Sequence, residues 1–340
     1  MTEFFRNLKQ IASSFLQKLQ TLLQKIPTSV QNIKKPASFW KPLIIGGAAV
    51  ICLYYPLGGL MIDNIDTSST YRPQNQNGKL ASADMAAYLI NREVHHKIWT
   101  PNLPFLFPSY FLDNMPNFQL GLMSAVSKTV SALSRAQITA VSQSAVDNLK
   151  ESAELLQYPG NVWLFSPQNN LIPAPSSATQ YKKGRKKLNI FNAAVAEGKV
   201  VFERSPQNLS LILKTIRKDI RSLILKTENH IFENNTSFFD FKADDTFYFA
   251  QGKLYAYSQL LRGLGLDFKT VLIKYDIYPQ WTTALKLLKD ASDLNPTIVR
   301  NGKLNSSFTP NHLTTINYFA SRTLNRLDNM INKLDKDTEK

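Results

Sequence analysis

Cysteine is almost absent from this sequence of 340 residues, and the single one is Cys52. One cysteine excludes a disulfide framework and a thiolate metal site built within one chain. A lone cysteine is tolerated in oxidising and reducing spaces alike. Cysteine usage therefore does not indicate the compartment.

Recognisable catalytic and metal-binding patterns are also missing. No Ser-His-Asp, zincin or nucleophile-elbow pattern supports a hydrolase. Glu93-x-x-His96 matches half of a di-metal carboxylate motif, but the sequence has no second copy of it. Residues 263–265, Gly-Leu-Gly, lack the third glycine of a dinucleotide-binding loop and are typical of a helix stop and turn. We predict no metal and no cofactor, and we favour a protein without enzymatic activity.

Acidic residues are few: 25 Asp and Glu stand against 40 Lys and Arg, a net charge of +15. Such a balance indicates a polyanionic partner, namely nucleic acid, anionic lipid or a charged envelope polymer. Residues 1–41 carry seven basic residues and one acidic residue, so their charge is the densest in the chain.

One apolar run is long enough to cross a membrane. Residues 42–62 contain no charged side chain and would extend about 31 Å as a helix, close to the thickness of a hydrocarbon core. A cleavable signal would begin nearer the N-terminus and end at a small-residue cleavage site, and a soluble core helix would carry fewer glycines. We predict a transmembrane signal anchor.

The flanks of this run predict its orientation. Basic residues crowd its N-terminal side, whereas Asp63 and Asp66 follow it. The positive-inside rule then keeps residues 1–41 in the cytoplasm and exports the chain from residue 63 onward. For a bacterial chain this predicts a single-pass inner-membrane protein with a periplasmic domain, and hence no nucleic-acid partner.

The arm of residues 1–41 has an amphipathic helical pattern. Its apolar residues recur at helical spacing from Phe4 to Ile26, with lysines and Arg6 on the rest of the wheel. Such an arm can lie on the inner leaflet and contact anionic lipid. The alternatives are a helix that binds a partner or one that is only solvated.

Beyond a polar linker at residues 63–80, helical patterns dominate residues 81–336. The expected fold class is mainly α: a non-repetitive, bundle-like all-α domain with little or no β. We expect helices at 81–98, at 119–156 as one or two pieces, and from 205, 245–262, 268–277, 280–293 and 309 onward, with strand-like segments at 162–165 and 199–205. Prolines and aromatics make residues 99–118 irregular, and residues 157–190 read as a Pro-rich and basic loop.

Two groups of residues are candidate binding sites. On the helix after residue 244, Asp244, Asp245, Tyr248, Gly252 and Tyr255 form a stripe that could line a ligand groove. Helix capping and close helix packing are the favoured explanation of this stripe, and acid-base work by the two carboxylates is a further alternative. The second group is the basic run Lys182, Lys183, Arg185, Lys186 and Lys187, a candidate contact for headgroups or an anionic polymer.

Three stretches carry a resemblance to a known family. "FLDNMPNFQLG" (111–121), "PGNVW" (159–163) and "DDTFYFAQGKLYAYSQLLRGLGLDF" (244–268) resemble a family of inner-membrane-anchored proteobacterial proteins catalogued as a domain of unknown function. The resemblance implies a bacterial source and one anchor, and it supplies no activity.

These observations support three functions in order. The first is a structural or interaction protein that binds an envelope protein or an anionic envelope polymer, with membrane lipid contacted through the anchor and the basic arm. The second is a lipid- or glycan-binding module that uses the Tyr/Gly-lined groove. The third is an envelope hydrolase.

Overall fold

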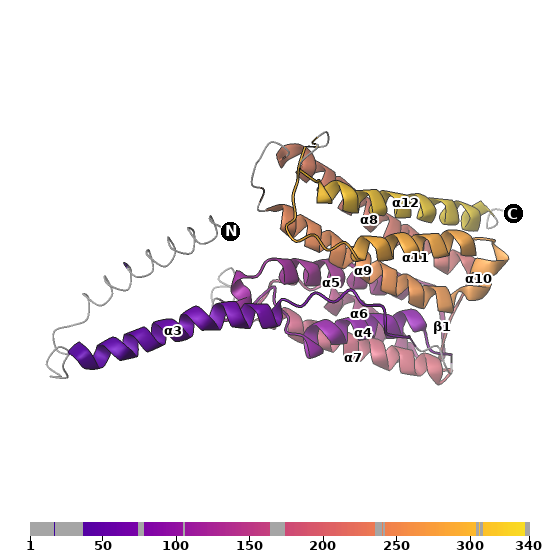
Figure 1. Cartoon of the computed structure of the whole chain (residues 1–340). Helices are drawn as coiled ribbons and strands as arrows, with labels where there is room; N and C mark the ends of the chain where they lie inside the picture. Colours follow the sequence, from indigo (N-terminus) through magenta and orange to yellow (C-terminus); the bar gives the residue numbers. More distant parts are fainter. Residues whose placement is uncertain are drawn as a thin grey trace. The chain divides into compact units, whose positions relative to one another are not determined.

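The computed structural model describes residue 17 and residues 37–73, 78–104, 106–163, 174–234, 240, 242–303, 306 and 309–336. It divides into two units, residues 1–54 and 55–340. The predicted amphipathic pattern of residues 1–41 lies almost wholly outside the described residues. The described helices and strands, drawn in Figure 1, are α3 (Ala37–Ile62), α4 (Ala81–Asn91), η2 (Arg92–His96), η3 (Pro108–Phe111), α5 (Asn114–Ser134), β1 (Ile138–Ala140), α6 (Gln143–Leu156), α7 (Ser177–Ala196), β2 (Val200–Phe202), α8 (Pro206–Asn234), α9 (Lys242–Asp267), α10 (Lys269–Lys274), α11 (Tyr278–Ser292) and α12 (His312–Lys336).

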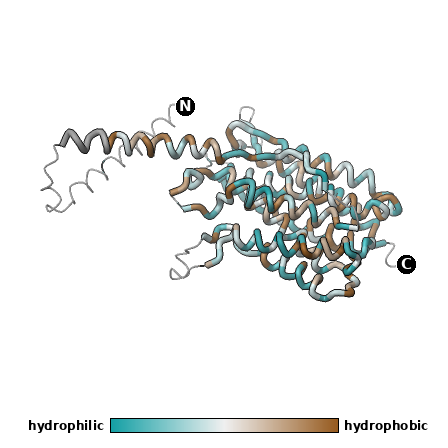
Figure 2. The backbone as a smooth tube through the Cα atoms, turned by 90° about the horizontal axis from the view of Figure 1, so that it is seen from below, coloured by the Kyte–Doolittle hydropathy of each residue, from teal (hydrophilic) through white to brown (hydrophobic). Residues whose placement is uncertain are grey.

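The prediction of a mainly α-helical chain with one long apolar N-terminal helix is confirmed. Within the described residues, Ile44–Ile62 is the one stretch of helix with the length and composition to cross a membrane, and 6% of it is buried. Its large apolar side chains face outward, including Met61, which is 84% exposed. In Figure 2 the helices of the second unit alternate between hydrophilic and hydrophobic residues, as helices with one buried face do.

Helix α9 is the central element of the second unit. It packs against α4, α5 and α11, and its side chains are buried almost all the way round from Ala250 to Leu264 (Figure 1). Small residues make this packing possible. A Cβ atom built on Gly252 would lie 2.0 Å from the carbonyl oxygen of Phe118 in α5, and one on Gly121 of α5 would lie 2.0 Å from that of Phe249. The two backbones are therefore in direct contact.

The predicted helix stop at residues 263–265 is wrong. Helix α9 continues through both glycines to Asp267. A Cβ atom on Gly263 would lie 2.7 Å from the carbonyl oxygen of Ala81, so this glycine admits the beginning of α4 instead of ending a helix. Asp267 then accepts hydrogen bonds from the backbone N–H groups of Ala81 and Ser82 at 2.7 and 2.9 Å.

The outer helices pack in pairs around this centre. Helix α6 packs on α7, and α8 packs on α12. The apolar stripe predicted for the helix after Ser205 is buried as expected, from Leu209 to Ile224. Strands β1 and β2 form a two-stranded antiparallel sheet, so the strand near residue 200 is confirmed. No strand includes residues 162–163, and residues 164–165 lie outside the described ones.

The loop expected over residues 157–190 is too long. Helix α7 begins at Ser177, where the hydroxyl of Ser176 accepts a hydrogen bond from the N–H of Thr179 at 3.3 Å and caps the helix. The basic run is therefore helical. Gly184, which read as a loop residue, is buried where the side chain of Leu156 in α6 packs against it.

Residues 63–73 have no helix or strand, as a linker should, but they are attached to the domain. Three hydrogen bonds fix them to α9: from Tyr255 to the carbonyl of Ser68 (2.8 Å), from Gln259 to Ser69 (2.8 Å) and from Arg262 to the carbonyl of Tyr71 (3.1 Å). The ring of Tyr71 also stacks on Tyr88 of α4, with 3.8 Å between centroids. Residues 63–73 are therefore bonded to the domain along their length.

Candidate functional site

The stripe predicted as a ligand groove is divided between two environments. Gly252 faces the backbone of Phe118, so a helix occupies the space that a ligand would need. Tyr255 is 1% exposed, and its hydroxyl accepts a hydrogen bond from Arg92 at 2.6 Å. Burial raises the pKa of Tyr255 to about 12, and the hydroxyl stays protonated. Gly252 and Tyr255 therefore belong to the packed interior.

Asp244, Asp245 and Tyr248 lie at the start of α9, in a cluster of carboxylates. Burial raises the pKa of Asp244 to about 6, aided by the negative charges of Asp113 and Asp245. Burial and Asp113 also raise the pKa of Asp245, which accepts a hydrogen bond from Asn117 at 2.6 Å. A carboxyl group with a pKa near 6 has the property that a general acid needs. Carboxylates crowded at the start of a helix raise one another's pKa in the same way in a site that has no catalytic role.

The basic run on α7 is a surface feature. Lys182, Lys183 and Lys186 are exposed, and Lys187 forms an ion pair with Glu151 of α6 at 2.7 Å. Desolvation and the charges of Lys182 and Arg185 lower the pKa of His95. The basic run on α7 is therefore near the end of η2, where His95 lies.

The predicted half-motif of a metal site is not assembled. Glu93 is fully buried and accepts hydrogen bonds from Arg92 and Gln119, whereas the ring of His96 contacts Asn91. Within the described parts of the chain, no group of three or more His, Cys, Asp or Glu side chains is arranged to hold a metal ion.

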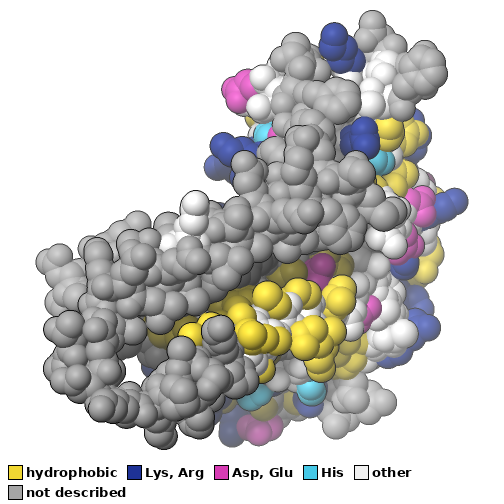
Figure 3. Space-filling model, turned by 60° about the vertical axis from the view of Figure 1, so that its left-hand side comes forward, with side chains coloured by type: hydrophobic (Ala, Val, Ile, Leu, Met, Phe, Trp, Pro, Cys, Tyr) yellow, Lys and Arg dark blue, Asp and Glu magenta, His cyan; other side chains and the backbone are white. Residues whose placement is uncertain are grey.

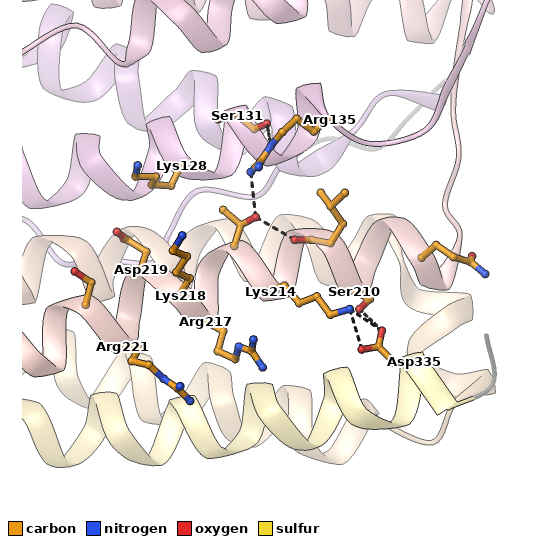
Figure 4. A pocket seen from close by; sticks show the side chains of 14 residues that line it. Lys128, Ser131, Arg135, Ser210, Lys214, Arg217, Lys218, Asp219, Arg221 and Asp335 are labelled. Atoms are coloured by element: carbon orange, nitrogen blue, oxygen red, sulfur yellow. Dashed lines mark hydrogen bonds and ion pairs between the residues drawn. The ribbon is translucent and has the colours of Figure 1, made fainter. Parts of the chain in front are cut away.

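A groove that the sequence analysis did not identify lies between α5, α8 and α12. Its volume is about 1140 Å³. Figure 4 shows that one wall carries side chains from α5 and the floor side chains from α8, with Asp335 of α12 at the end. Six basic side chains line it: Lys128, Arg135, Lys214, Arg217, Lys218 and Arg221.

The two carboxylates that line this groove are already engaged. Asp219 accepts a hydrogen bond from Tyr257 at 2.7 Å and pairs with the buried Lys253 at 2.8 Å. Asp335 pairs with Lys214 at 2.8 Å and accepts from Ser210 at 2.6 Å. Partial burial would raise the pKa of Asp335, but these hydrogen bonds hold it below its ordinary value.

The charge left over in the groove is positive. In the part of the chain that the structure describes, Lys128 and Lys218 form no ion pair; Lys128 lies along α5, and Lys218 points from α8 toward it (Figure 4). Burial lowers the pKa of Lys253 beside the groove; Asp219 opposes this, and the positive charges of Lys128 and Lys226 lower the pKa further. An anion that entered the groove would relieve this repulsion.

Hydroxyl and amide groups complete the lining. Ser131, Thr215, Ser222 and Gln207 lie among the basic residues. Lys and Arg beside hydroxyl donors are the groups that bind phosphate and carboxylate oxygens, because they supply charge and directed hydrogen bonds together. The groove therefore has the groups needed to bind an anion.

Part of the basic lining of the groove can be recognised from the sequence. Four of the lining cations, from Lys214 to Arg221, fall on the polar face of the helix after Ser205, opposite its apolar stripe. The sequence does not show that α5 and α12 lie along that face, because the contacts join distant residues: Arg135 and Thr215 are 80 residues apart, and Arg217 and Asp328 are 111 apart.

Comparison with known proteins gives one finding. No curated protein and no solved structure matches the chain significantly. A family model matches residues 102–231, a range that runs from the segment before α5 nearly to the end of α8 and so includes every lining residue of the groove except Asp335. The family resemblance is confirmed to this extent: over residues 102–231 the chain matches DUF2333, described as an uncharacterized protein conserved in bacteria.

Proposed function

We propose that this chain is a single-pass inner-membrane protein whose periplasmic helical domain binds an anionic polymer of the cell envelope in the groove between α5, α8 and α12. One observation carries the proposal: six basic side chains line the groove, and its two carboxylates already have partners. Lys214 is paired with Asp335, and Arg217 and Arg221 share Asp328 of α12. Among the described residues, Lys128, Arg135 and Lys218 form no ion pair, and they supply the net positive charge. The domain is a binding protein and acts without turnover.

The anchor supports the location. The exposed apolar side chains of α3 are stabilised by acyl chains and destabilised by water. Lysines and arginines before the helix and aspartates after it favour an N-terminus in the cytoplasm.

The position of the groove favours a polymer over the lipid that surrounds the anchor. Leu112, just before α5, contacts Gly59 near the end of α3, so the start of α5 lies close to the end of the apolar helix. Lys128 and Arg135 follow 14 and 21 residues after Asn114, which corresponds to roughly 20 to 30 Å along a helix. The basic residues of the groove are therefore too far along α5 for a headgroup of the surrounding bilayer to reach them, whereas a long polymer could do so.

The test measures binding of fluorescein-labelled polyphosphate to the full-length protein in nanodiscs of neutral phosphatidylcholine. The variant Lys128→Gln, Lys218→Gln, Arg221→Gln should bind at least about 10-fold more weakly and lower the slope of log K against log salt by about 2 to 3, because each lost contact removes nearly one released counterion.

The matched control removes the same charge from α7, with Lys182→Gln, Lys183→Gln and Lys186→Gln. This variant should bind the probe as the wild type does. Equal weakening in both variants would show that net charge, and not the groove, determines binding, and the proposed site would be abandoned.

The rival function is an envelope hydrolase, which one observation favours: the pKa of Asp244 is raised to about 6. Cleavage of purified peptidoglycan by the full-length protein, abolished by Asp244→Asn, would replace binding with hydrolysis.

A further inference from the structure

The described residues 98–104 and 106–112, called here segment 98–112, lie between η2 and α5 and expose apolar side chains that a soluble surface normally hides. Ile98 is 51% exposed, Leu106 is 63% exposed and Tyr110 is 55% exposed. Prolines at 101 and 104 interrupt regular structure, and the short 3-10 helix η3, which begins at Pro108, leaves Tyr110 on the outside. Exposed apolar residues gathered in one segment indicate a contact with another surface.

The inner side of this segment is firmly attached, so its exposed side is held outward. Trp99 is 3% exposed and donates a hydrogen bond to the carbonyl of Gly160 at 2.9 Å. Asn102 donates to the carbonyl of Val162 at 2.6 Å. The segment is thus a fixed part of the second unit.

The segment lies against the last turns of α3, which belong to the same unit. A Cβ atom built on Gly58 would lie 2.4 Å from Cγ of Pro108, and one on Gly59 would lie 3.7 Å from Cδ2 of Leu112. Gly58 precedes Ile62, the last residue of the apolar run, by four residues, or about 6 Å of helix. In a bilayer that α3 crosses up to Ile62, Pro108 would lie at the depth where the acyl chains meet the headgroups.

The surroundings of the segment match a headgroup layer. Nζ of Lys97 donates to the carbonyl of Asn64 at 2.6 Å, directly after the apolar helix. Lys182 and Arg185 lie near His95 on the same side. Asp63 and Asp113 are also at this end and are near each other. Figure 3 turns the side of the molecule that carries α3 toward the viewer and shows hydrophobic side chains gathered in one area of that face. Aromatic and basic residues around an apolar surface are typical of membrane interfaces.

We propose that segment 98–112 is a second membrane contact, in which Leu106, Phe107 and Tyr110 enter the bilayer interface beside the end of α3. This proposal depends on the proposed membrane span. It gives the domain two attachments to the lipid, and with residues 63–73 bonded to α9 it holds the domain at one orientation on the membrane.

The test uses the full-length chain with Cys52→Ala, reconstituted in nanodiscs of phosphatidylcholine and phosphatidylglycerol at three to one. Single cysteines at Leu57, Leu106, Tyr110 or Val141 carry the environment-sensitive dye NBD. Quenching by a lipid spin-labelled at acyl carbon 5 is compared with quenching by aqueous iodide. We expect the dyes at 57, 106 and 110 to lose most of their intensity to the lipid quencher, and the dye at 141, where Val141 is 92% exposed, to respond to iodide alone.

The two proposals fail in different ways. A dye at 57 quenched by lipid, with dyes at 106 and 110 quenched by iodide only, overturns the second contact and leaves the anchor intact. A dye at 57 that the lipid quencher does not reach overturns the span itself.

Discussion

Gly252→Ala should lower the free energy of unfolding of the domain by about 3 kcal/mol, the upper end of the usual cost of overpacking. The added methyl group would lie 2.0 Å from the carbonyl oxygen of Phe118, and a backbone atom within a packed helix cannot rotate away as a side chain can. Thermal unfolding of the full-length protein in detergent, followed by circular dichroism, should show a midpoint lower by roughly 6 to 12 °C.

Gly184→Ala is the matched control, because it adds the same methyl group to another buried helical glycine. There the nearest atoms belong to the side chain of Leu156, at 3.0 Å, and this side chain can adjust. Alanine also favours a helix by about 1 kcal/mol over glycine. We expect a change within about 1 kcal/mol. A Gly252→Ala protein as stable as the wild type would show that α5 and α9 do not touch there and would restore the Tyr/Gly-lined ligand groove.

Glu93→Ala should destabilise the domain even more, by about 3 to 5 kcal/mol, because it leaves the guanidinium of a buried arginine without its countercharge. Arg92 is 5% exposed, and its Nε lies 2.7 Å from the Glu93 carboxylate. The same carboxylate accepts a hydrogen bond from the buried Gln119 at 3.1 Å. Chemical denaturation of the full-length protein measures the loss.

A double-mutant cycle separates the pair from the rest of the network. Adding Arg92→Met to Glu93→Ala removes the unpaired charge, so the double variant should lose less stability than the sum of the two single losses. Simple additivity would mean that the two side chains do not interact, contrary to the geometry.

The sequence predicted those elements whose pattern is local. The apolar stripe from Leu209 to Ile224, the absence of charge before Asp63 and the proline-interrupted segment near residue 104 each depend on neighbours in the chain, and each is present. Helix α7 was missed because five basic residues around Gly184 resemble a solvated loop, whereas in the structure its buried face packs on α6.

The remaining differences have one cause, which is contact between distant segments. From the sequence alone, Gly263 indicates the end of a helix, but in the structure it makes room for Ala81 of α4. Gly252 likewise suggests space for a ligand, but in the structure the backbone of Phe118 occupies that space. The groove likewise requires α5 beside α8, a pairing that no periodicity reveals. Residues 63–73 read as a linker because their polar side chains do not show that Tyr255 and Gln259 bind them.

The central claim is that the N-terminal arm and the helical domain lie on opposite sides of the inner membrane, and cysteine labelling tests it most directly. With Cys52 replaced by alanine, Gln10→Cys and Val141→Cys each provide a single thiol, and intact spheroplasts are treated with a membrane-impermeant maleimide. We predict that Val141→Cys reacts in intact spheroplasts and that Gln10→Cys reacts only after the membrane is permeabilised. Protection of Val141→Cys in intact spheroplasts would place the domain in the cytoplasm and contradict the proposed function.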